Sequence, residues 1–564
     1  MWRIRIIGGS IVLFALIFLA RAFQLQVIQA ETYKNRAESQ NLGQAETLYD
    51  RGTIFFRKKD GVLVSAATLR PAYTLLIVPD KLKNPESAYR LLSQHIELDR
   101  DNFLFRAGQR DGKYKEIRSS IDSESAEKIK SLALTGIELR AGRERYYPGE
   151  DLASHVLGFV GHNEEGYSGR YGLENYYEDS LSREDSPVYR NFFVEMFSDL
   201  GTVLLADKSE RKGDIVLTIE PIVQAFVESE LDDLDETYHS ASGGAVIIDP
   251  ATGEVLAMAA VPDFHPGNYK EEKDINVFGN PLVSNVYEFG SIVKPLTMAA
   301  GLDAGKVSEN DTYNDKGSVV VGDARIHNFD FKARGVVPMQ EILNQSLNTG
   351  AVHVMQQMGR GLFREYIENY GLGDITQIDL PGEVSGNIVN LYEERDVEFA
   401  TASFGQGVAF TPMEMTRALA TLANGGILVR PHLVAEFRYE SLPSKRAKTE
   451  EQSKVLKQST SRRISEMLTT VVDEALLGGK VALPRYSIAA KTGTAQIPAP
   501  EGGYYDDQYL HSFFGYFPAY EPRFLVFLYI VKPEGKRYAS ETLTEPFMDI
   551  AEFLLNYYEV PPDR

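Results

Sequence analysis

Gly290-Ser291-Ile292-Val293-Lys294 is the stretch of this 564-residue sequence that says most about the chain. Ser291 and Lys294 are three residues apart, so a helix that begins at Gly290 places the hydroxyl and the amine on one face. A serine hydroxyl is a weak nucleophile until a base takes its proton, and a lysine is such a base only when burial or a second cation lowers its pKa. The helix N-terminus also directs backbone N–H groups at an oxygen that becomes anionic during attack. The stretch therefore predicts a nucleophilic serine with a lysine base.

The Ser-x-x-Lys spacing alone is a weak signal, because the chain repeats it at Ser125/Lys128 and Ser209/Lys212 among many charged residues. We expect those two pairs to be solvated surface. Ser291 differs in its apolar setting, which consists of Phe289, Ile292, Val293, Leu296 and Met298.

Ser346-Leu347-Asn348 opens a predicted helix at 349–358 and offers a hydroxyl and an amide at alternate positions. Serine and asparagine also favour helix caps, and Ser-x-Asn recurs at 39–41 and 385–387. This element therefore supports a site only in combination with the others.

Lys491-Thr492-Gly493-Thr494 lies in a strand-like run at 486–497 and occurs once in the chain. We expect Lys491 to supply the second cation and the two threonines to hold a substrate carboxylate. Gly493 is expected to let an extended peptide lie close to the strand edge. The alternative is a weakened edge strand with a surface lysine, which is less convincing beside the other two motifs.

The second half of the chain is predicted to be an α+β domain. It opens after the small residues 240–244 with a hairpin at 245–258, which contains the turn Asp249-Pro250-Ala251-Thr252-Gly253. Apolar periodicity predicts helices at 340–358, 411–424 and 546–557, and strands at 486–495, 512–517 and 524–531. Strands at both ends with helices between them predict a central antiparallel sheet flanked by helices.

The first half reads as mixed short strands and helices, such as a helix at 123–134 and a strand at 214–219. Before it, residues 6–20 are uncharged and lie between arginines, which predicts a membrane segment. A removable signal peptide is the alternative. The helical pattern continues past Arg21, so we expect the segment to stay attached, with the bulk of the chain on the far side.

Composition excludes several classes of function. The net charge of −21 and the absence of a basic cluster disfavour nucleic-acid binding. Zero cysteines exclude disulfides, thiolate catalysis and cysteine-based metal sites. The length predicts two folded units of ordinary globular composition.

The three motifs, in this order, resemble the signature of penicillin-binding proteins and class A β-lactamases. Nearly the whole chain is similar to the class B penicillin-binding proteins, which are monofunctional D,D-transpeptidases. The further matching segments are Arg145-Tyr146-Tyr147-Pro148, Gly172-Leu173-Glu174, Asp379-Leu380-Pro381-Gly382-Glu383, Gly405-Gln406-Gly407, Thr411-Pro412 and His511-Ser512-Phe513.

The resemblance implies roles for the motif residues. Ser291 would be the acylated nucleophile and Lys294 its base. Ser346 and Asn348 would relay protons and hold the substrate amide, and Lys491 would keep Lys294 neutral.

The remaining roles implied by the resemblance concern substrate binding. Thr492, Gly493 and Thr494 would bind the substrate, and the backbone N–H groups of Ser291 and Thr494 would form the oxyanion hole. The resemblance implies neither a metal nor a cofactor.

For the whole chain, the resemblance implies a transmembrane anchor at 1–30, a pedestal or dimerisation-type domain at 31–239, a transpeptidase domain at 240–557 and a tail at 558–564. A short cytoplasmic N-terminus would precede a single membrane pass and an extracytoplasmic enzyme. That enzyme would cross-link peptidoglycan stem peptides with release of terminal D-Ala and be inhibited by β-lactams.

The expected partners are a polytopic membrane glycosyltransferase and division proteins. Cell division is favoured over elongation because the sequence ends soon after the catalytic domain. Gly8 and Gly9 are small residues that would suit contact between membrane helices, although small residues are common in such helices.

The chain departs from the family pattern at three places. Phe289 stands where the family usually has proline, so we expect a looser approach to the catalytic helix. Phe56 replaces an acidic residue after the Arg51-Gly52-Thr53-Ile54 motif, and Glu220 replaces a common aspartate, which puts partner contacts in doubt.

Other functions remain as alternatives. An elongation-type transpeptidase shares every motif. A serine enzyme that hydrolyses or senses β-lactams is less favoured, because the glutamate that resembles a deacylating residue, Glu341, precedes Ser346 and so stands in the wrong order. An inactive scaffold is disfavoured by the intact motifs, and no glycosyltransferase-like carboxylate motif precedes residue 240.

Overall fold

The computed structural model describes residues 50–110, 114–163, 166–183, 212–440, 442–447 and 453–564. The predicted anchor, with Gly8 and Gly9, lies outside these ranges. Within them, no helix combines the length and the apolar character that a membrane crossing requires. The described residues divide into two compact units, of which the smaller lies within 71–143 and the larger within 51–70, 144–183 and 212–564.

The smaller unit is a short sheet covered by helices. The second part of β2 (Leu63–Ile77) pairs antiparallel with β3 (Lys115–Ile121) and also pairs with β4 (Ile137–Tyr146). The helices are α3 (Pro85–Leu92), α4 (Arg100–Gly108) and α5 (Ser123–Ser131). Their apolar faces bury Leu92, Phe103 and Ile129 against Leu75 of β2. The helix predicted at 123–134 is present as α5. Asp122 caps its N-terminus, and the helix ends at Ser131, three residues earlier than predicted.

One sheet of the larger unit joins segments that are far apart in sequence. β1 (Ile54–Arg57) pairs with the first part of β2 and, in parallel, with β7 (Gly213–Leu217). β15 (Val434–Tyr439) pairs with β7 and with β16 (Lys445–Arg446). The strand predicted at 214–219 is β7, which ends two residues earlier than predicted.

The central sheet of the larger unit has the strand order β18-β19-β20-β8-β9 and is antiparallel throughout. Its strands are β8 (Ser242–Ile248), β9 (Val255–Val261), β18 (Ala489–Pro498), β19 (Tyr504–Phe517) and β20 (Phe524–Val531). β20 pairs with β8, with Val526 opposite Ile247, so the two ends of the predicted α+β domain meet in one sheet. This part of the prediction is confirmed.

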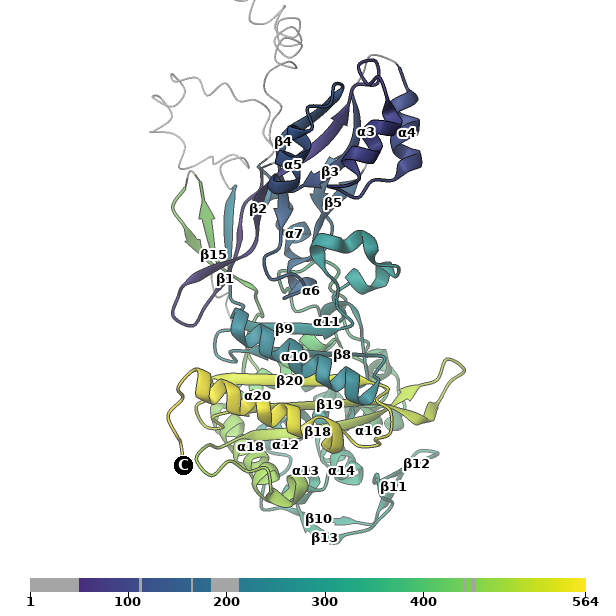
Figure 1. The fold of residues 1–564 in the computed structure, drawn as a ribbon. Helices are drawn as coiled ribbons and strands as arrows, with labels where there is room; N and C mark the ends of the chain where they lie inside the picture. Colours follow the sequence, from purple (N-terminus) through teal and green to yellow (C-terminus); the bar gives the residue numbers. More distant parts are fainter. Residues whose placement is uncertain (1–49, 111–113, 164–165, 184–211, 441, 448–452) are drawn as a thin grey trace, which may run out of the picture. The chain divides into compact units, whose positions relative to one another are not determined.

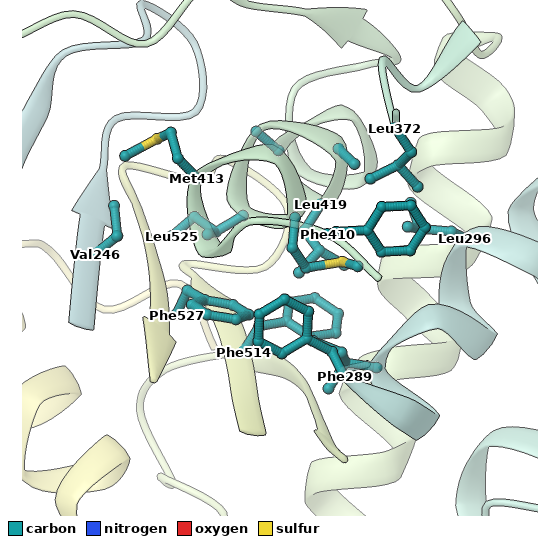
Figure 2. Close-up of a cluster of buried hydrophobic side chains, with 14 of the residues drawn as sticks. Val246, Phe289, Leu296, Leu372, Phe410, Met413, Leu419, Phe514, Leu525 and Phe527 are labelled. Atoms are coloured by element: carbon teal, nitrogen blue, oxygen red, sulfur yellow. The ribbon is translucent and has the colours of Figure 1, made fainter. Parts of the chain in front are cut away.

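Helices cover both faces of the central sheet. α10 (Pro221–Tyr238) and α20 (Thr544–Tyr557) lie together across one face (Figure 1), where Phe226 and Phe553 stack with ring centroids 4.1 Å apart. α12 (Lys294–Asp303), α17 (Pro412–Ala423) and α18 (Gln458–Thr470) pack on the other side. Figure 2 shows Phe514 and Phe527 of the sheet meeting Phe289 and Leu419 in this core.

The larger unit contains further helices and four pairs of short strands. The helices are α6 (Ser154–Leu157), α7 (Gly172–Tyr176), α8 (Glu178–Leu181), α11 (Pro281–Ser284), α13 (Met339–Asn344), α14 (Asn348–Met358), α15 (Arg360–Asn369), α16 (Asp396–Ala402) and α19 (Ala539–Thr542). The short strands pair as β5 (Val160–Asn163) with β6 (Gly166–Gly169), β10 (Thr312–Asp315) with β13 (Gly335–Pro338), β11 (Ser318–Val321) with β12 (Ala324–His327), and β14 (Ile427–Leu428) with β17 (Ser453–Lys454).

The helix predicted at 340–358 is two helices. α13 ends at Asn344 and α14 begins at Asn348, because Ser346 between them has a left-handed backbone with φ of 53°. A regular helix cannot pass through that conformation. The break therefore separates the Ser346 motif from the helix before it.

Candidate active site

Ser291 lies in a single 3-10 turn, η5 (Gly290–Val293), which leads directly into α12. The predicted helix that begins at Gly290 is confirmed. Pro295 is tolerated because it lies in the first turn of α12, where a backbone N–H would have no hydrogen-bond acceptor within the helix. Gly290 has a φ of 63°, a conformation that favours glycine, and it turns the chain into the helix.

The amine of Lys294 connects two of the predicted motifs. Its Nζ lies 3.0 Å from Ser291 Oγ, 2.6 Å from the carbonyl oxygen of Ser346 and 3.1 Å from Ser346 Oγ. Only 1% of Lys294 is exposed. A neutral amine in this position donates to the carbonyl of Ser346 and keeps its lone pair for the proton of Ser291.

The pKa values of the two buried lysines are lowered unequally and for different reasons. Burial, together with the nearby Lys491 ammonium, holds the pKa of Lys294 well below its usual value. Burial also lowers the pKa of Lys491, to about 8. Lys491 therefore remains mostly charged at neutral pH, while Lys294 is the lysine that gives up its proton.

Lys491 is 3% exposed and its Nζ donates to the carbonyl oxygen of Thr492 at 2.9 Å. Its strand, β18, is at one edge of the central sheet and runs beside η5. The sheet thus brings the third motif to the first, as the sequence predicted.

Thr492 and Thr494 line the cavity described below, whereas Gly493 faces the opposite way. A Cβ at Gly493 would lie 2.6 Å from the carbonyl oxygen of Phe289 and would collide with Ser512 Oγ. Side chains alternate along a strand, so Gly493 points away from the cavity that its two neighbours line. The prediction that Gly493 makes room for a substrate peptide is therefore wrong. The glycine makes room for the segment that leads into η5.

A cavity of about 680 Å³ opens in front of the three motifs. Ser291, Ser346, Asn348, Thr492 and Thr494 all line it, and the two lysines lie behind this wall. The outer walls carry aromatic and charged residues that the sequence did not single out, namely Arg325, Phe329, Phe331, Asp506, Tyr509, Arg537 and Tyr538. They come from β12 and the segment after it, from the start of β19 and from the segment before α19, and they share no recognisable spacing.

The expected loose approach to the catalytic helix is wrong. Phe289 is 0% exposed and packs edge-on against Phe527, with ring centroids 5.2 Å apart (Figure 2). Its carbonyl oxygen accepts a hydrogen bond of 2.9 Å from Ser512 Oγ, and Gly290 N donates to the carbonyl oxygen of Gly405. Aromatic packing and these hydrogen bonds replace the rigidity that proline would give.

Of the other Ser-x-x-Lys pairs, Ser125 and Lys128 lie on the exposed side of α5, where Lys128 pairs with Glu124. This confirms the prediction of solvated surface. Ser209 lies outside the described residues.

A buried ion cluster connects three segments that the sequence grouped only by resemblance. Glu174 is 0% exposed, and its oxygens accept from Arg51 and Arg145, each at 2.6 Å. Burial alone would raise the pKa of Glu174, but the two guanidinium groups outweigh it and hold the pKa below its usual value. The sequence held no signal for this pairing, since Arg51 and Glu174 are 123 residues apart.

Residues 243–552 match the family described as the penicillin-binding protein transpeptidase domain, and residues 48–190 match the penicillin-binding protein dimerisation domain. The chain belongs to the penicillin-binding proteins. With both domains present, this penicillin-binding protein is of class B, and it is a serine-type peptidoglycan D,D-transpeptidase of cell-wall synthesis.

Relatives match over most of the penicillin-binding protein. It is 31% identical over 513 residues to stage V sporulation protein D of Bacillus subtilis, which covers 88% of this chain and 77% of that protein. It is 27% identical over 572 residues to peptidoglycan D,D-transpeptidase FtsI of Escherichia coli, which covers 100% of this chain and 93% of the relative.

Solved structures share the fold. Penicillin-binding protein 2X from Streptococcus thermophilus superposes with a TM-score of 0.72 at 20% identity, over 91% of this chain and 81% of that one. Penicillin-binding protein 3 from Mycobacterium tuberculosis, complexed with aztreonam, gives a TM-score of 0.68 at 23% identity, over 92% and 98%.

Proposed function

We propose that this enzyme cross-links peptidoglycan stem peptides through an acyl-enzyme on Ser291, in cell division. The observation that carries the proposal is the position of the Lys294 amine, within 3.0 Å of Ser291 Oγ and with its pKa held low. A neutral amine at that distance can take the serine proton at physiological pH.

In the first half-reaction, Lys294 takes the proton of Ser291 as Oγ attacks the carbonyl carbon of the penultimate D-Ala. The backbone N–H groups of Ser291 and Thr494 stabilise the oxyanion. The C–N bond then breaks, the leaving D-Ala takes a proton that Lys294 and Ser346 return to it, and an ester on Ser291 remains.

In the second half-reaction, an amine from another stem peptide attacks the ester. Lys294 accepts the proton of that amine and Ser291 leaves with a proton, which restores the site and forms the cross-link. Asn348 holds the amide of the donor peptide throughout.

The charged end of the donor peptide meets β18. Lys491 attracts the terminal carboxylate of D-Ala-D-Ala, and the hydroxyls of Thr492 and Thr494 bind it. A β-lactam carries a carboxylate and a reactive amide in a similar arrangement, so it acylates Ser291 and blocks the enzyme.

The wider setting follows from the resemblance. Residues 1–30 anchor the protein in the cell membrane, residues 31–239 form a pedestal or dimerisation-type domain, and the transpeptidase domain at 240–557 works outside the membrane, followed by a tail at 558–564. The similarity to FtsI over the whole chain supports division over elongation. A polytopic glycosyltransferase and division proteins are the proposed partners.

The test is a peptide reaction. Purified protein is given a synthetic donor that ends in D-Ala-D-Ala and an amine acceptor, and free D-Ala and the cross-linked product are measured. We expect both in equal amounts with the wild type and neither with Ser291→Ala. Release of D-Ala without any cross-link would favour a hydrolytic enzyme, and uniform lateral-wall localisation of the protein would favour elongation.

A further inference from the structure

A buried polar cluster lies at the first turn of α14, next to the Ser346 motif. It consists of Asp315 on β10, Asn328 after β12 and Thr349 on α14, which are 1%, 1% and 6% exposed. We call these three residues the Asp315 cluster. None of them belongs to the three motifs, and the proposed reaction assigns them no step.

Asp315 gathers hydrogen-bond donors from several segments. Its Oδ1 accepts from Thr349 Oγ1 at 2.8 Å, from Gly317 N at 2.9 Å and from Asn328 Nδ2 at 3.0 Å. Its Oδ2 accepts from Arg334 N at 3.0 Å and from Asn328 Nδ2 at 3.1 Å. A buried carboxylate is costly unless its oxygens are hydrogen-bonded, and these donors satisfy it.

The carboxylate of Asp315 fixes the orientation of Asn328. The Nδ2 of Asn328 donates to Asp315 and, at 3.2 Å, to the carbonyl oxygen of Lys332. Its Oδ1 must then face the other way, where it accepts from the backbone N of Thr349 at 3.2 Å. The Oγ1 of Thr349 lies equally close to this oxygen, but its single proton goes to the nearer Asp315. Reversing the amide would place N–H groups against Thr349 N and an oxygen against the carboxylate.

Asn328 thereby caps α14. Leu347 stands at the N-cap position of this helix and provides no side-chain hydrogen bond. The Oδ1 of Asn328 satisfies one of the free N–H groups at the helix start, a task usually performed by a residue in the same helix.

The capped turn carries the Ser346 motif. Asn348 immediately precedes Thr349, and its Nδ2 donates to the carbonyl oxygen of His327 at 2.9 Å. Ser346 keeps its left-handed backbone and presents its carbonyl oxygen to Lys294 at 2.6 Å. Since His327 and Asn328 are adjacent, one chain segment holds both Asn348 and Thr349.

We propose that Asp315 is a positioning residue that acts through Asn328 and Thr349 to hold Ser346 and Asn348 in their reactive geometry. This rests on the roles proposed above for Ser346 and Asn348. Lys491, Thr492 and Thr494 lie on β18, and none of the hydrogen bonds of the Asp315 cluster reaches them. Loss of the cluster is therefore expected to slow acylation more than it weakens the initial, non-covalent binding of a β-lactam.

The test compares two substitutions at Thr349 in the full-length protein. Thr349→Val removes the hydroxyl at nearly constant shape, whereas Thr349→Ser keeps it. Stopped-flow measurement with a fluorescent penicillin separates the acylation rate constant from the dissociation constant of the non-covalent complex. We expect Thr349→Val to lower the rate constant by roughly 10- to 100-fold, as small misplacements of reacting groups do, and Thr349→Ser to stay near the wild type.

A second comparison uses Asp315→Asn and a matched control, Asp323→Asn, at the exposed turn between β11 and β12. Asp315→Asn should lower the acylation rate constant with a smaller change in the dissociation constant, and Asp323→Asn should change neither. Equal impairment of Thr349→Val and Thr349→Ser would overturn this inference and leave the proposed function standing. A normal acylation rate constant in folded Asp315→Asn would do the same. A wild type that penicillin fails to acylate would overturn the proposed function, and this inference with it.

Discussion

Gly405 lies directly against Gly290, the residue that turns the chain into the catalytic helix. Gly290 N donates to the carbonyl oxygen of Gly405 at 3.1 Å, and a Cβ on Gly405 would lie 2.2 Å from the carbonyl oxygen of Gly290. The Gly-Gln-Gly segment, which the sequence offered only as a family likeness, therefore supports the position of Ser291.

Gly405→Ala is accordingly expected to slow acylation of Ser291 by about 10-fold or more, because the new methyl group displaces the turn at Gly290. The control is Gly382→Ala: Gly382 also has a positive φ, 77°, but its Cβ would meet nothing within 4 Å. Backbone strain should cost each variant about 1–2 kcal/mol of stability, and the contact with Gly290 should make the loss larger in Gly405→Ala. Rates of labelling by fluorescent penicillin that fall equally in both would contradict the proposed contact.

Lys294→Ala is expected to lower the acylation rate by about 100-fold or more, since a positioned base typically contributes that much. Lys128→Ala is the matched control, because Lys128 has the same Ser-x-x-Lys spacing but lies on the surface. The measurement is the rate of labelling in the folded variants. A near-normal rate in Lys294→Ala would mean that another group is the base.

The pH dependence of acylation should have two limbs. As pH falls through the lowered pKa of Lys294, the amine becomes protonated and activity is lost on the acid side. As pH rises through about 8, Lys491 loses its charge and its attraction for the substrate carboxylate. Lys491→Arg should remove the alkaline limb, because arginine stays charged, even if the rate is lower at every pH. An unchanged alkaline limb in this variant would show that Lys491 is not responsible for it.

The ion cluster around Glu174 should matter for stability. Glu174→Ala leaves Arg145 buried without the carboxylate of Glu174, while Arg51 keeps its ion pair with Glu178, and the variant is expected to cost about 3–5 kcal/mol of unfolding free energy. Glu254→Ala is the comparison, since Glu254 pairs with Arg57 at a partly exposed position and should cost about 1 kcal/mol or less. Urea unfolding measures both.

The same cluster predicts an acid-sensitive fold. Because the pKa of Glu174 is lower in the folded state, its stabilisation is present above the usual carboxyl pKa and is lost as pH falls through the folded value. When the pH is lowered from about 5, the unfolding free energy of Glu174→Ala should therefore fall less than that of the wild type. Parallel curves for the two proteins would contradict this assignment.

The sequence predicted those parts of the protein that depend on local patterns. The continuous apolar runs of β8 and β20 and the periodicity of α17 and α20 were sufficient to place the central sheet and its helices. The Ser291, Ser346 and Lys491 motifs were recognised by residue type and order, and the structure brings them to one cavity.

What the sequence could not predict depends on contacts between distant segments. The left-handed Ser346 that divides α13 from α14 is held by Lys294, 52 residues away in sequence. Asp315 and Thr349 are separated by 34 residues with no periodic pattern between them, so their hydrogen bond left no trace. The direction of Gly493 depends on the strand register, which the motif alone does not fix.

The central claim, that Ser291 is the acylated nucleophile, is tested most directly by the mass of the intact protein after treatment with penicillin. The wild type should gain the mass of one penicillin, and peptide mapping should place it on Ser291. Folded Ser291→Ala should gain nothing. A stable adduct on folded Ser291→Ala, or one that maps to another residue of the wild type, would contradict the claim.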